Sequence, residues 1–324
     1  MIHSLLAVAS CLWLSLCTPE RSMRELESWI RSKAGEDLRT CEDGMVVGEH
    51  YCAVVDGATS PTGRRWTSAG LTGGQWAANI LCEAIPNLKP TLTPQQAIQQ
   101  LTDAIQQAYR CEEGALEVVT ANPEERATAC LIVYSKHRHE IFVVGDCQAI
   151  VLDDQRRILQ TIQPVKHNDV VMSQARSMML QIERLLDKNK NTNDDDGTDN
   201  ALFEELRQRH QQDIGRALIR PLLLGQRLFQ NNLDAPKPFR YWAMDGFPIH
   251  EEGIEVFPLS PDAKEIVLAS DGYPRLFTTL AETEAHLFDI LHQDPQLCEV
   301  LPNTKGMREG AESFDDRTYL RLAL

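Results

Sequence analysis

Basic residues and paired-cysteine motifs are scarce in this sequence. Lysine and arginine number 32, against 47 aspartates and glutamates, and the formal net charge is −15 over 324 residues. Because phosphate backbones attract basic surfaces, this balance argues against a nucleic-acid-binding protein. None of the nine cysteines belongs to a C-x-x-C pair. An odd number of cysteines without a spacing pattern favours a reducing compartment over a disulfide framework.

The apolar N-terminus lacks the basic residues with which an export signal begins. Residues 1–17 contain no lysine or arginine, and they are too few to span a membrane as a stable helix. We therefore expect residues 1–22 to be either a weak export signal or an extension before a true start at Met23. A cytoplasmic protein without a stable membrane span is favoured, and an exported protein is the alternative.

Local signals predict several regular elements. Thr93-Pro94-Gln95-Gln96 and Thr279-Leu280-Ala281-Glu282 have the form of capping boxes, which begin helices. Residues 19–33 carry four apolar side chains on one helical face, which predicts an amphipathic helix. Residues 240–243 are predicted to form a strand.

Acidic residues occur at the ends of five predicted strands. The run Tyr51-Cys52-Ala53-Val54-Val55 is typical of a strand covered on both faces, and it stops at Asp56-Gly57. A carboxylate at the end of a buried strand costs free energy unless a positive charge pairs with it. Acidic residues border four further strands, at Glu42-Asp43, Gly145-Asp146, Ser270-Asp271 and Asp315-Asp316. We expect these residues to converge on one point.

Asp56-Gly57 has a simpler interpretation when it is taken alone, because Asp-Gly is a favoured turn pair. The recurrence of the pattern favours a shared site instead. The motifs bring no set of cysteines or histidines with them, and carboxylate oxygens suit Mg²⁺ or Mn²⁺ better than Zn²⁺.

The order of the five motifs, over roughly residues 35–324, resembles that of the PPM, or type 2C, metal-dependent serine/threonine protein phosphatases, in a divergent bacterial-type form. The resemblance implies an α+β fold, the αββα sandwich, in which two central antiparallel sheets are flanked by helices. It also implies hydrolysis of phosphoserine or phosphothreonine in a protein substrate, through a water activated by two Mn²⁺ or Mg²⁺ ions. The phosphatase-like domain would span residues 23–324.

The resemblance also implies roles for individual residues. The implied metal ligands are Glu42, Asp56, the carbonyl of Gly57, Asp146, Asp271 and Asp315. Asp56 would bridge the two ions and Asp43 would hydrogen-bond a metal-bound water, while Asp146 matches a third, weaker metal site. The family has a phosphate-binding arginine before the Glu-Asp motif, and Arg39 is the nearest candidate, one residue from that spacing. Arg64 and Arg65 are the alternatives.

The sequence departs from the family pattern in three places. Ala58-Thr59-Ser60 follows Asp56-Gly57 where a histidine or methionine and two glycines are usual, so the histidine proposed as a general acid in some members is absent. Cys147 replaces a serine after Asp146. A helical insertion over about residues 165–235, with a polar linker at 187–200, replaces the usual flap. We expect this insertion to cover the active site.

Two other functions stay open on the sequence alone. One is a catalytically silent regulatory module with the phosphatase fold, and the other is an acidic binding domain without phosphate chemistry. Retention of the acidic residues favours the enzyme.

Overall fold

The computed structural model describes residues 23–60, 62–67, 69–190 and 213–324. The predicted leader, residues 1–22, and most of the predicted linker, residues 187–200, lie outside the described residues. None of the described helices is long and apolar enough to cross a membrane.

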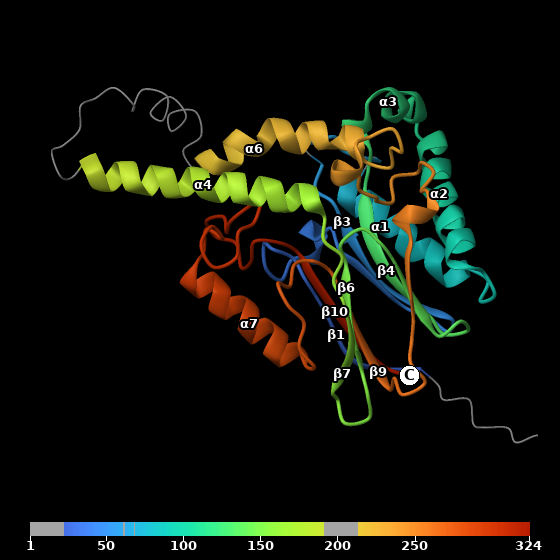
Figure 1. Cartoon of the computed structure of the whole chain (residues 1–324). Coiled ribbons are helices and arrows are strands. Elements are labelled where there is room, and N and C mark those ends of the chain that lie inside the picture. Colours follow the sequence, from blue (N-terminus) through green and yellow to red (C-terminus); the bar gives the residue numbers. More distant parts are fainter. Residues whose placement is uncertain (1–22, 61, 68, 191–212) are drawn as a thin grey trace, which may run out of the picture.

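Two five-stranded sheets form the centre of the molecule (Figure 1). All neighbouring strands within each sheet are antiparallel. In order across it, the first sheet contains β1 (Arg24–Arg31), β10 (Arg317–Ala323), β9 (Glu265–Ala269), β6 (Gln148–Leu152) and β7 (Ile158–Ile162). The second sheet contains β2 (Gly44–Val47), β3 (Tyr51–Gly57), β4 (Ala129–Ser135), β5 (Glu140–Val144) and β8 (Glu255–Pro258).

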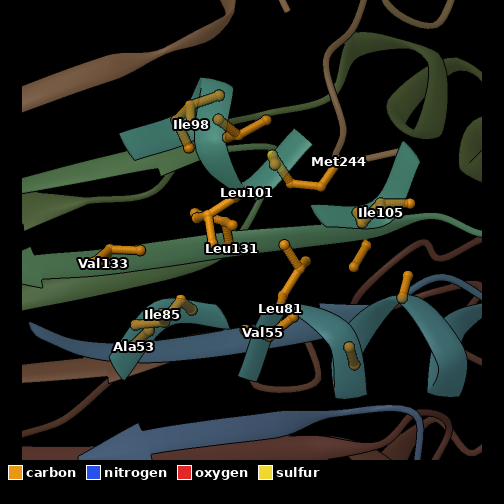
Figure 2. Packing of buried hydrophobic residues seen from close by; sticks show 14 of the residues in the cluster. Ala53, Val55, Leu81, Ile85, Ile98, Leu101, Ile105, Leu131, Val133 and Met244 are labelled. Atoms are coloured by element: carbon orange, nitrogen blue, oxygen red, sulfur yellow. The ribbon is translucent and has the colours of Figure 1, made fainter. Parts of the chain in front are cut away.

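The three central strands of the second sheet, β3, β4 and β5, are buried on both faces, which explains their long apolar runs. In β3, Cys52 and Val54 face the other sheet, whereas Ala53 and Val55 face a layer of helices. Figure 2 shows both residues within this helix-covered core, with Val55 close to Leu81 and Ala53 close to Ile85. Side chains of a strand point alternately to its two faces, so a strand between two apolar layers needs apolar residues at every position.

Helices cover the outer faces of both sheets, as the αββα prediction requires. The helices α1 (Gly73–Ala84), α2 (Pro94–Cys111) and α3 (Ala115–Ala121) pack on the second sheet. On the first sheet lies α7 (Leu280–Gln293). The predicted capping box at Thr93 is present, because Thr93 and Gln96 exchange side-chain and backbone hydrogen bonds. The α+β sandwich prediction is confirmed.

In the described part of the predicted insertion, the helices α4 (His167–Lys190) and α6 (Ile214–Gly225) lie side by side (Figure 1). The buried guanidinium of Arg176 in α4 donates to the carboxylate of Asp213, the N-cap of α6, at 2.9 Å. It also donates to the carbonyls of Leu297 and Asn303, at 3.2 and 2.9 Å. One side chain therefore joins both helices to the segment that precedes β10.

Two local predictions are wrong. Residues 24–31 form the edge strand β1, paired with β10, and not part of a helix. Residues 240–243 form no strand, and Tyr241 makes only an isolated bridge with Gln230. In both cases tertiary hydrogen bonding overrides the local pattern.

Candidate metal centre

Three of the predicted acidic residues meet at one edge of the sandwich. Asp56 lies at the end of β3, Asp146 follows β5 and Asp271 follows β9. Each residue offers one carboxylate oxygen, and these oxygens all lie within 4.8 Å of one another. The strands β3 and β5 both pair antiparallel with β4, so they run in the same direction and end at the same edge.

The crowding of these carboxylates makes ionisation costly. Desolvation raises the pKa of Asp56 well above its ordinary value, and the nearby carboxylates of Asp43 and Asp315 raise it further. Desolvation also raises the pKa of Asp271, and the nearby carboxylates of Asp56 and Asp146 raise it further. Part of Asp271 is nevertheless exposed to solvent. A cation at this point would relieve both the desolvation and the repulsion.

A second acidic group lies beside the first and surrounds Lys33. The ammonium of Lys33 is 3.2 Å from carboxylate oxygens of Glu42 and Asp316, and 3.7 Å from Asp315. Lys305 forms a further ion pair with Asp315. Desolvation opposes the ionisation of Asp315, but Lys305 and Lys33 outweigh it and lower its pKa.

The carboxylate of Glu42 has a partner for each oxygen. Oε1 accepts a hydrogen bond of 2.6 Å from Thr72, the N-cap of α1. Oε2 accepts hydrogen bonds from Thr59 and from Lys33. Thr59 belongs to the segment in which the sequence departs from the family pattern, so this departure places a hydroxyl group on a predicted metal ligand.

Asp43 lies between the two acidic groups. Desolvation, together with Asp316 and Asp315, raises its pKa to about 8. Its carboxylate accepts a hydrogen bond of 2.9 Å from the hydroxyl of Thr318 in β10. Burial in this position therefore favours the protonated form of the carboxyl group.

Gly57 is required by close backbone packing. A Cβ atom at this position would contact the carbonyl of Glu42 and would lie 2.6 Å from the carbonyl of Gly74. Only glycine allows the end of β3, the start of α1 and the Glu42 segment to approach so closely. The role of its own carbonyl as a metal ligand stays a prediction.

The predicted phosphate-binding arginines contact other groups. The side chain of Arg39 is 90% exposed and pairs with Asp37. Arg64 lies over the ring of Trp66, and Arg65 donates to the carbonyl of Gly70. Within the described part of the chain, none of the three lines the cavity beside the aspartates.

This cavity has a volume of about 440 Å³ and separates the acidic edge from the insertion. Asp56, Asp146, Asp271 and Asp315 line one side. The other walls carry six cationic residues, most of them from the insertion or next to it: Lys166, Arg216, Arg227, Lys237, Arg240 and Lys305. The cavity therefore offers oxygen ligands for a cation on one side and positive charges for an anion on the other.

The residues of the first group fit a divalent cation. Their donors are all carboxylate oxygens, which Mg²⁺ and Mn²⁺ prefer. Burial and neighbouring carboxylates raise the pKa of Asp56 and of Asp271, and a bound cation would offset both effects. The acidic group around Lys33 is a less suitable cation site, because the ammonium of Lys33 already neutralises part of the charge of Glu42 and Asp316. Sequence reasoning missed Lys33, Thr59, Thr72 and Lys305, since no spacing rule connects them with the acidic motifs.

The solved structures that resemble this chain include bacterial serine/threonine phosphatases. The serine/threonine phosphatase PstP/Ppp from Mycobacterium tuberculosis is 15% identical, with 94% of this chain and 99% of that chain covered and a TM-score of 0.42. The serine/threonine phosphatase Stp1 from Staphylococcus aureus is 12% identical, with 93% and 96% covered and a TM-score of 0.41. The comparison with curated protein sequences gave no match.

The sequence was also compared with models of protein families. The model described as protein phosphatase 2C matches residues 39–299. The match includes Glu42, Asp56, Asp146 and Asp271, and it covers well over half of the chain. The chain therefore belongs to the protein phosphatase 2C family.

Proposed function

We propose that the protein is a phosphatase that hydrolyses phosphoserine or phosphothreonine in a protein substrate and depends on Mn²⁺ or Mg²⁺. The observation that carries the proposal is the meeting of three carboxylate oxygens, within 4.8 Å of one another, at a cavity whose other walls are cationic. Family membership supports the same class of reaction.

Asp56, Asp146 and Asp271 would hold one ion, and Asp315 lines the same cavity. A second ion, shared by Asp56 and Glu42, would have to compete with the ammonium of Lys33. When bound, the ions would polarise a phosphoryl oxygen and lower the pKa of the attacking water.

The chain's own residues would position the reactants. Asp43, held by Thr318, would orient the water through a hydrogen bond. The insertion would close the cavity over the substrate, because residues on and next to α6 line its walls. Exclusion of bulk water strengthens the electrostatic interactions inside such a cavity.

A regulatory module without turnover is the second candidate, and one observation favours it. Lys33, Thr59 and Thr72 already satisfy both oxygens of Glu42. If these contacts persist when metal is added, a dinuclear centre would not assemble.

Hydrolysis of p-nitrophenyl phosphate by the purified protein, with Mn²⁺ and with EDTA, tests the proposal. We expect turnover that requires Mn²⁺ and is lost in Asp56→Asn, which also controls for contaminating phosphatases. Binding of Mn²⁺ without turnover would favour the regulatory module. Absence of both would exclude the two candidates.

A further inference from the structure

Arg227 is a buried cation without a carboxylate partner. It lies in the short 3-10 helix Gln226–Phe229, directly after α6, and is only 7% exposed. Its Nη1 donates to Thr128 Oγ1 at 2.7 Å and to Gln230 Oε1 at 2.6 Å. Both acceptors are neutral, and no carboxylate among the described residues forms an ion pair with Arg227.

The other buried arginines of the described chain differ in this respect. Arg176 pairs with Asp213 at 2.7 Å, Arg317 with Glu284 at 2.8 Å, and Arg321 with Glu27 at 2.9 Å. A buried charge without a counter-ion costs several kcal/mol. The buried arginine that lacks a carboxylate is also the one that lines the cavity beside the aspartates and is linked to the segment after Asp56.

A hydrogen-bonded network fixes the guanidinium of Arg227. Gln230 Oε1 also accepts from the hydroxyl of Tyr241 at 3.0 Å, and its Nε2 donates to Asp245 at 2.7 Å. Since Asp245 is fully buried and pairs with Arg126, the amide of Gln230 is held with its oxygen toward Arg227. The position of the cation is therefore set before any ligand binds.

Arg227 is connected to the metal centre through one residue. The carbonyl of Thr128 accepts a hydrogen bond of 2.9 Å from the amide of Ala58, two residues after Asp56. Asp56, Thr128 and Arg227 line the same cavity. A group bound at the aspartates would thus lie in the cavity that Arg227 also lines.

Other cations of the cavity are already paired or less buried. Lys166 is 3.1 Å from Asp169, Arg240 is 3.2 Å from Glu252, and Lys305 pairs with Asp315. Arg216 is half-buried and donates to the carbonyl of Thr304, and Lys237 is exposed.

We propose that Arg227 binds the phosphoryl group of the substrate, in the role for which the sequence suggested Arg39. The proposal rests on the proposed phosphatase function. A phosphoryl group supplies the missing negative charge, and guanidinium groups bind phosphate oxygens through two parallel hydrogen bonds. The cation for substrate recognition would then come from the insertion and not from the segment before Glu42.

Calorimetric titration of inorganic phosphate into the Mn²⁺-loaded protein tests the proposal without requiring turnover. Arg227→Gln keeps a donor for Thr128 but removes the charge, and we expect its Kd for phosphate to rise roughly ten- to hundredfold. Its KM for p-nitrophenyl phosphate should rise by a similar factor. Arg138→Met removes a cation that pairs with Glu140 outside this cavity, and it should change both constants less than threefold.

Arg227→Lys is the second variant, because it keeps the charge and loses the two-pronged geometry. We expect its Kd for phosphate to rise by more than threefold, but by less than in Arg227→Gln. A Kd within threefold of wild type in the folded Arg227→Gln or, if that variant does not fold, in Arg227→Lys would overturn the proposal. So would a wild-type protein that binds no phosphate.

A phosphopeptide that carries acidic residues beside the phosphorylated residue distinguishes two ligands for Arg227, the phosphoryl group and an acidic side chain of the substrate. If Arg227→Gln raises KM for this peptide but not for p-nitrophenyl phosphate, Arg227 recognises an acidic side chain and the proposal is wrong. Loss of p-nitrophenyl phosphate turnover in the wild type would contradict the proposed function, whereas the phosphate titration would still decide the role of Arg227.

Discussion

At the scale of single residues, Lys33 determines the charge balance of the acidic edge. Its ammonium lies 3.2 Å from both Glu42 and Asp316, whose side chains are only 4% and 3% exposed. Proximity to Asp315, Glu42 and Asp316 outweighs desolvation and raises the pKa of Lys33. The lysine therefore stays charged and serves as a built-in counter-ion for carboxylates that would otherwise repel one another.

Replacement of this counter-ion should destabilise the metal-free protein. For Lys33→Met we expect a loss of roughly 2–3 kcal/mol in the free energy of unfolding, measured with urea in EDTA. The loss is smaller than for a fully buried pair, because 27% of the Lys33 side chain is exposed. Arg39→Met, which removes an exposed cation, is the control and should change little. Equal effects of the two substitutions would contradict this role of Lys33.

The raised pKa of Asp43 predicts how stability depends on pH. An unfolded aspartate has a pKa of about 3.9, whereas the pKa of Asp43 in the fold is about 8. The folded state thus holds this proton more tightly, so its contribution to stability is present below about pH 4 and is lost as the pH rises through about 8. In EDTA, we expect the melting temperature of the wild type to fall more between pH 5 and 8 than that of Asp43→Asn. Parallel curves for the two proteins would refute the assignment.

The acidic residues could be predicted from the sequence, but most of their partners could not. Asp56 and Asp271 directly follow apolar runs, and because a buried carboxylate costs free energy, they could be identified as candidate site residues. Lys33, Thr59 and Arg227 acquire their contacts only when distant segments meet. Thr59, for example, donates to a residue 17 positions earlier, and nothing in its local sequence predicts that contact.

At the scale of elements, the sequence predicted buried strands from their apolar runs and helices from their capping residues. β3 was predictable because both of its faces are apolar, and α2 because Thr93 caps it. β1 was not, because its apolar residues have helical spacing and its conformation depends on hydrogen bonds to β10, almost 300 residues later. The insertion was predicted as helical, but its anchor at Arg176 was not.

The contacts of Arg176 predict how the insertion is held. Arg176→Leu removes the cation that joins α4, the N-cap of α6 and the segment around Asn303. We expect a loss of about 3–5 kcal/mol in the free energy of unfolding, and faster hydrogen exchange in residues 214–225 and 297–307. Arg184→Leu, on the same helix but paired with Glu299 at the surface, is the matched control and should have little effect. Exchange that is unchanged in Arg176→Leu would show that the helices are held by other contacts.

At the scale of the whole molecule, two antiparallel sheets bring together residues that are far apart in the chain. Asp56 and Asp146 reach the acidic edge from one sheet, and Asp271 and Asp315 reach it from the other. The insertion places cations opposite them, although the chain as a whole has a net charge of −15. The fold therefore concentrates a cation site and an anion site in a single cavity.

The central claim is that the aspartates at this edge hold divalent metal for phosphate hydrolysis. The most direct measurement is calorimetric titration of Mn²⁺ into Asp56→Asn and Asp271→Asn, alongside hydrolysis of a phosphopeptide. We predict weaker Mn²⁺ binding and turnover reduced by more than the roughly 10–100-fold typical of residues that only support a ligand. Asp154→Asn, in an exposed turn, should behave like the wild type. Wild-type binding and turnover in the Asp56 and Asp271 variants would contradict the claim.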